Sequence, residues 1–157
     1  MRDLLAHAAQ LGVSVHVAHI DGPERGFYDS ARKIVVYDFG LTPVERVCVL
    51  AHELGHAFYD HQRRGDASAE DDADFYAACL LIDPEAYAEA ERFDPAQASI
   101  AEALGVEERL VRVFERRALT RVRGATYVHP RLGRGQYAWR GFTRSATVAA
   151  TPADFGA

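Results

Sequence analysis

The pattern of apolar and polar residues predicts a short sheet near the N-terminus, followed by several helices. Apolar positions at helical spacing predict a first helix over residues 2–11. The valine-rich alternation of residues 13–19 predicts a strand. Two further short strands are expected at residues 25–28 and 33–37, on either side of a hairpin turn at residues 29–32.

A long apolar helix with a well-defined start follows these strands. Thr42 suits the N-cap and Pro43 the first helical position, while Glu45 completes a capping box. This helix is expected to continue to about His61. Four more helices are expected over residues 68–82, 84–92, 94–104 and 106–118.

The periodic pattern of apolar and polar residues ends after about residue 122, and the segment that follows contains five glycines. Residues 121–157 are therefore expected to form a basic, flexible tail. The expected fold class is α+β. Residues 1–83 would form a core with a small N-terminal β-sheet, and residues 84–120 a C-terminal helical bundle that extends this core.

Composition and length fit one domain without a membrane span. The 157 residues are 48% apolar and 26% charged, which suits a single hydrophobic core. No uncharged apolar stretch of about 18 residues occurs, and the N-terminus lacks the apolar run of a signal peptide. A cytoplasmic protein is therefore expected. Cys48 and Cys79 lie in apolar helical patterns and are expected to be buried free thiols.

The net charge of −5 is unevenly distributed along the chain. Residues 1–119 hold twelve basic and twenty-two acidic side chains, whereas residues 120–157 hold six arginines and one acid, Asp154. The folded part is therefore not expected to bind nucleic acid through bulk charge. That role remains open for the tail.

The strongest chemical signal is the HELGH segment of the apolar helix. His52 and His56 lie four residues apart, so both imidazoles share one helix face and reach one ion. Glu53 lies about 100° round the helix from His52, where it can meet a water molecule without taking a ligand position. Two ordinary surface histidines are the alternative. The preceding apolar run, residues 47–51, argues against it because buried imidazoles need partners.

Gly55, between the two histidines, indicates a close approach by another segment. Glycine weakens a helix by about 1 kcal/mol relative to alanine. Its presence in a buried helix suggests that a side chain at this position would obstruct packing.

A third metal ligand is expected on the next helix. The apolar face of that helix consists of Ala73, Ala77, Leu80 and Leu81. Glu70 and Asp74 lie on the same stripe. Acidic residues are favoured at helix N-termini, which explains Asp71 and Asp72 but not acids on the buried face. We therefore assign Glu70 as the ligand and Asp74 as the acceptor for the free ring N–H of a ligand histidine.

Two runs together resemble the ImmA/IrrE family of metallopeptidases: VLAHELGHAFYDH at residues 49–61 and ExxADxYAxxLL at residues 70–81. The resemblance covers roughly residues 10–115. It implies a zincin-like metallopeptidase core in which His52, His56 and Glu70 bind Zn²⁺ and Glu53 is the general base. The usual carboxylate or amide one turn after the third ligand falls on Asp74.

One departure concerns the end of the second motif. Many family members read Leu-Leu-Met-Pro there, whereas this chain reads Leu80-Leu81-Ile82-Asp83-Pro84. The proline comes one residue later, which affects the helix exit but not the ligands.

Known family members act on repressor-type transcription regulators. The resemblance therefore implies a zinc-dependent endopeptidase that cleaves such a partner, of the kind carried by phages and mobile elements. In zincins an edge strand beside the active-site helix holds the substrate backbone, and residues 33–37 are the expected edge. The residue that stabilises the oxyanion stays open among His16, His19, Tyr28, Tyr37, His61 and His129.

Residues 97–112 resemble a helix-turn-helix. The second helix begins with Glu107 and Glu108, which would face DNA phosphates unfavourably. Three arginines of that helix share one face: Arg109, Arg112 and Arg116. We favour a packed helical hairpin or a protein-docking surface over direct DNA contact.

Two functions remain open. One is a regulatory peptidase, and the other is a non-catalytic antirepressor or toxin–antitoxin binding module on the same fold. Glu53 favours the first, because a pure binder has no chemical need for a general base. The substrate, the cleavage site, the activating trigger and the oligomeric state are not determined by the sequence.

Overall fold

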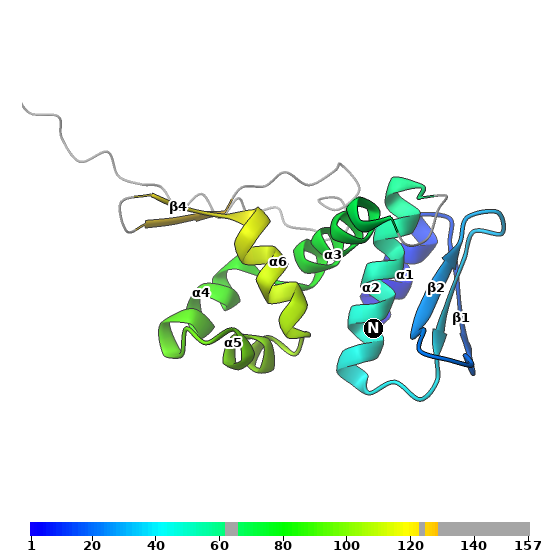
Figure 1. Ribbon diagram of the computed structural model, residues 1–157, viewed down its shortest axis with the longest axis horizontal. Helices are drawn as coiled ribbons and strands as arrows, with labels where there is room; N and C mark the ends of the chain where they lie inside the picture. The colour runs from blue at the N-terminus through cyan, green and yellow to red at the C-terminus, as the bar shows by residue number, and fades with distance from the viewer. Residues whose placement is uncertain (62–65, 123–124, 129–157) are drawn as a thin grey trace, which may run out of the picture.

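The computed structural model describes residues 1–61, 66–122 and 125–128. Within these ranges the chain is α+β, with the sheet at one end, α4 and α5 at the other, and α2 and α3 between them (Figure 1). The elements are α1 (Arg2–Gln10), β1 (Ser14–Ala18), β2 (Gly26–Asp29), β3 (Ile34–Asp38), α2 (Pro43–Tyr59), α3 (Ala67–Leu81), α4 (Pro84–Phe93), α5 (Gln97–Leu104), α6 (Glu108–Ala118), β4 (Leu119–Val122) and β5 (Ala125–Val128).

The N-terminal sheet has the strand order β1-β3-β2, with β3 parallel to β1 and antiparallel to β2. The expected turn between β2 and β3 is present, and the Asp29 carboxylate accepts backbone hydrogen bonds from Ala31 and Arg32. The expectation that residues 33–37 form the substrate edge is wrong, because β3 is paired on both sides. Its unbroken apolar run, residues 34–37, is typical of such an interior strand. The edge beside the motif helix is β2.

Helix α2 begins as the sequence predicts. The Thr42 hydroxyl accepts the Glu45 N–H, while the Glu45 carboxylate accepts the Thr42 N–H at 2.9 Å. These reciprocal bonds satisfy backbone donors that the helix leaves free at its start. The helix ends at Tyr59, two residues before the expected end, because Asp60 takes a left-handed conformation with φ of 53°. Along its length α2 packs on β2, β3, α1 and α3.

Helices α2 and α3 cross at Gly55, which confirms the predicted close approach. A Cβ atom on Gly55 would lie 2.8 Å from the Cα and 2.9 Å from the carbonyl oxygen of Ala73. Both distances are shorter than normal carbon contacts, and the opposing atoms belong to the backbone of α3. The glycine therefore sets how closely the N-terminal half of α3 approaches the two motif histidines.

Replacing Gly55 by Ala should destabilise the fold. Alanine alone would strengthen α2 by about 1 kcal/mol, but the clash with α3 should cost about 1–3 kcal/mol. We expect a lower urea midpoint and weaker metal binding, because α3 is pushed away from α2. Adding Ala73→Gly should not restore stability, since the clash involves backbone atoms. An unchanged or higher midpoint for Gly55→Ala would contradict this account of the crossing.

The C-terminal helices pack as a unit, with α6 against α3 and α5 against α6. The buried residues of α6 include Leu110, Val111 and Phe114, which belong to the hydrophobic core. Helix α5 begins at Gln97 rather than at residue 94, because the Asp94 carboxylate accepts bonds from the Ala96 N–H and the Ser99 hydroxyl. These local bonds form a turn that competes with the helix.

The start of the expected tail differs from the prediction. Strands β4 and β5 pair antiparallel, with Leu119 opposite Val128, so residues 121–157 are not uniformly without secondary structure. The remainder of the expected tail, residues 129–157, lies outside the described residues.

Both cysteines are buried free thiols, as expected from the apolar patterns around them. Cys48 on α2 and Cys79 on α3 form no disulfide. Among the helices of the described ranges, none has both the length and the apolar character that a membrane crossing requires.

Candidate metal centre

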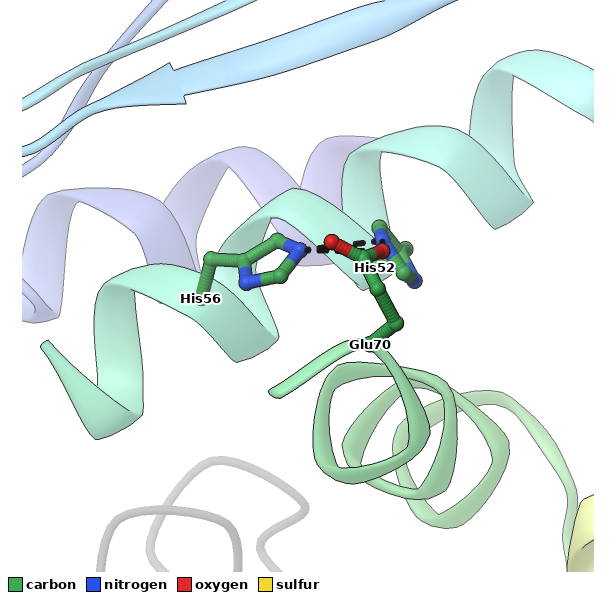
Figure 2. Close-up of side chains that lie close together, drawn as sticks. All are labelled: His52, His56 and Glu70. Carbon is green, nitrogen blue, oxygen red and sulfur yellow. Dashed lines mark hydrogen bonds and ion pairs between the residues drawn. The ribbon is translucent and has the colours of Figure 1, made fainter. Parts of the chain in front are cut away.

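Three ligand-type atoms from two helices converge beside the α2–α3 crossing. His52 Nε2 lies 3.1 Å from His56 Nε2 and 3.2 Å from Glu70 Oε2, and His56 Nε2 lies 3.6 Å from the same oxygen. Figure 2 shows the Glu70 carboxylate of α3 facing the two imidazoles of α2. A tetrahedral ion with bonds of about 2.0–2.2 Å requires ligand atoms about 3.3–3.6 Å apart. The three atoms therefore fit one metal ion with little rearrangement.

Asp74 orients the first of these histidines. Its Oδ1 lies 2.7 Å from His52 Nδ1, so Nδ1–H donates to the carboxylate and Nε2 is left to face the centre. Burial opposes ionisation of Asp74. The hydrogen bond from His52 and the positive charge of Arg109 outweigh it and hold the Asp74 pKa below its ordinary value. Asp74 is therefore a carboxylate at neutral pH and lies where it can accept the free ring N–H of His52.

The second histidine has a partner that the sequence did not indicate. His56 Nδ1 lies 2.9 Å from His61 Nδ1, so His56 can donate Nδ1–H to His61 while its Nε2 faces the centre. Burial, followed by the positive charge of His52, lowers the pKa of His56 to about 4. The His56 imidazole is therefore neutral at neutral pH, which is the form that binds metals.

Glu53 lines the same cleft as the three ligand-type residues. The cleft has a volume of about 650 Å³, and Glu53, one of its lining residues, is only 7% exposed. Residues 24–30, which include β2, also line this cleft. The arrangement joins a buried carboxylate, a candidate metal centre and an edge strand in one cavity.

The structure narrows the candidates for oxyanion stabilisation. Among the described residues, Tyr28 and His61 line the cleft, whereas His16, His19 and Tyr37 do not. His129 lies outside the described residues. His61 already contacts His56, and the Tyr28 hydroxyl is buried from solvent, so the structure does not single out either residue as the oxyanion donor.

Arg109 of α6 also reaches the centre, although its spacing in the sequence indicated only that it shares a helix face with Arg112 and Arg116. It donates to Asp74 and, at 2.8 Å, to Glu107. Arg112 pairs with Glu108, and Arg116 pairs with Asp71. Each of the three arginines is thus paired with a carboxylate of the chain itself. Direct DNA binding stays a prediction, and the less favoured one.

The sequence comparisons agree with this geometry. The family model described as the IrrE N-terminal-like domain, a peptidase family, matches residues 8–114. No curated protein matches the chain significantly. The matched range covers more than half of the chain and includes the sheet, the α2–α3 crossing and most of α6. The chain therefore belongs to the IrrE N-terminal-like family of metallopeptidases.

Proposed function

We propose that this protein is a zinc-dependent endopeptidase that cleaves a partner protein. The observation that carries the proposal is the convergence of His52, His56 and Glu70 beside the buried carboxylate of Glu53. A binding surface alone would require neither three converging ligand atoms nor an adjacent general base.

The donor set supports zinc as the metal. Two imidazole nitrogens and one carboxylate oxygen are the ligands of a large class of catalytic zinc sites, which keep the fourth position for water or substrate. A bound zinc ion would supply Lewis acidity, which polarises the scissile carbonyl and lowers the pKa of a water molecule to about 7. His52, His56 and Glu70 would hold it.

Glu53 would carry the protons of the reaction. Its carboxylate accepts a proton from the attacking water as the water oxygen bonds to the carbonyl carbon. The same proton then passes to the amine nitrogen as the C–N bond breaks. Because Glu53 is almost fully buried, its carboxylate is held against the cleft wall rather than moving freely in solvent.

Strand β2 is suited to hold the substrate backbone. Its outer edge is unpaired within the described part of the chain, and its residues line the cleft. An extended peptide could add to this edge through main-chain hydrogen bonds. Gly26 lets β2 lie close to α2, since a Cβ there would stand 2.6 Å from Val49 Cγ1. The edge is thereby held at a fixed distance from the motif helix.

For the partner we propose a repressor-type transcription regulator in the cytoplasm. The support is the resemblance of the two motifs to peptidases that act on such regulators, together with the family match. Regulators encoded beside the gene are the first substrates to test.

The test is incubation of the zinc-loaded protein with these regulators, with fragments identified by mass spectrometry. We expect one or a few defined cuts that disappear with a chelator and return with added zinc. A regulator that is bound but stays intact under all conditions would favour the antirepressor alternative.

A further inference from the structure

Arg109 connects the C-terminal helical unit to the candidate metal centre. It lies in the first turn of α6, yet its side chain lines the cleft together with His52 and Asp74. We infer that Arg109 is a positioning residue of the metal centre, acting on His52 through Asp74. This inference rests on the metal site of the proposed function and adds a residue from outside the two sequence motifs.

A single carboxylate oxygen of Asp74 links Arg109 to His52. Asp74 Oδ1 accepts the His52 Nδ1–H at 2.7 Å and also accepts a hydrogen bond from Arg109 Nη1. The side chains of Arg109 and Asp74 are only 30% and 21% exposed. At such partly buried positions a charge-assisted bond is stronger than an exposed surface ion pair. Arg109 thus restricts the rotation of the same carboxylate that orients the His52 ring.

Arg109 is itself held in place from its other side. Its Nε donates to Glu107 Oε2 at 2.8 Å, and Glu107 also accepts two hydrogen bonds from Arg25. Arg25 immediately precedes β2. The contacts therefore run from the edge strand through Arg25, Glu107, Arg109 and Asp74 to His52, and they join four separate segments of the chain.

The location of Asp74 explains why a second partner is needed. Asp74 lies one helical turn after Glu70 on α3, and both side chains line the cleft. A carboxylate in that place that is bound only by His52 could turn toward the cleft and compete as a ligand. Arg109 opposes this rotation because its planar guanidinium bonds Asp74 and Glu107 from different nitrogens. A lysine ammonium keeps the charge but lacks this rigid fork.

The test is therefore Arg109→Lys, which retains the charge and removes the fork. Zinc affinity would be measured by competition with a chromophoric chelator. Loss of a direct partner of a metal-bound histidine typically weakens metal binding by about 10–100-fold, which we expect for Asp74→Asn. For Arg109, one contact further out, we expect a smaller loss of about 3–10-fold.

Arg117→Lys is the matched control. Arg117 also joins α6 to α3, donating to Asp71 and Asp72 at 2.9 Å each, and its side chain is 29% exposed. Its loss should weaken the same helix contact without changing zinc affinity. In the Asp74→Asn background, Arg109→Lys should produce no further loss of zinc affinity, because the carboxylate through which Arg109 acts on His52 is already absent.

A second measurement follows the His52 ring directly. In ¹⁵N-histidine NMR spectra of the zinc-loaded protein, Arg109→Lys should accelerate solvent exchange of the His52 Nδ1 proton, and Arg117→Lys should not. Equal zinc affinity and equal exchange in wild type and Arg109→Lys would overturn the inference. If the wild type bound no zinc, the proposed metal site itself would fail, which is a different result.

Discussion

Replacing Glu53 by Gln should abolish most cleavage while leaving the zinc site intact. Glutamine keeps the size and hydrogen-bonding capacity of the side chain but cannot take a proton from water. We expect cleavage of the partner regulator to fall by at least about 10²-fold, the usual scale for loss of a general base. Zinc content and the unfolding midpoint should stay near wild type, because Glu53 is not among the three converging ligand residues.

The same variant separates catalysis from binding. If cleavage is the working step, relief of a repressed promoter should be lost together with cleavage at equal protein levels. If Glu53→Gln still relieves repression, the antirepressor function replaces the peptidase. The zinc site would then support a docking surface rather than a reaction.

Removing any one of the three converging side chains should remove most of the metal. We expect about one zinc per purified wild-type chain, and a loss of affinity above about 100-fold for His52→Ala, His56→Ala or Glu70→Ala. The reason is that each change leaves only two protein donors. The variants should also unfold at lower denaturant concentration, because metal binding contributes to folding free energy. Metal analysis and urea unfolding, with and without chelator, measure both effects.

Asp71→Ala is the control for the carboxylate ligand. Asp71 adjoins Glu70 on α3, and the two side chains are 42% and 43% exposed. Asp71 faces Arg116 and Arg117 rather than the cleft, so its removal should leave the zinc content unchanged. Full zinc retention in Glu70→Ala would show that another group is the third ligand. Asp74 is poorly placed to replace it, because its Oδ1 is already bonded by His52 and Arg109.

Those features of the site that depend on residues close together in the sequence could be predicted from the sequence alone. The capping box at Thr42 and Glu45 predicts where α2 begins, and the four-residue spacing of His52 and His56 then places both rings on one face. These features depend on contacts within one or two helical turns, which adjacent residues determine by themselves. Gly55 shows that one packing contact could also be predicted. A glycine in a buried helix predicts that another segment lies close to it, and the structure identifies that neighbour as Ala73.

Other features depend on how distant segments meet. The substrate edge was expected on β3, but pairing on both sides makes β3 interior and leaves β2 at the edge. The paired strands β4 and β5 lie where the glycine-rich sequence suggested only a tail. The residues of a short strand have only a weak intrinsic preference for β-structure. Pairing with other strands therefore decides both which strand lies at the sheet edge and whether β4 and β5 form.

The sequence by itself determined the family, the α+β class, the motif helix and the identity of the residues able to hold a metal. Only the tertiary structure decided that β2 lines the same cleft as these residues, that His61 contacts His56, and that Arg109 reaches Asp74 across 35 positions of sequence. The physical reason is the separation in sequence between the residues that interact. Helix periodicity and capping arise from neighbouring residues, whereas the meeting of α2, α3 and α6 follows from packing of buried side chains far apart in the chain.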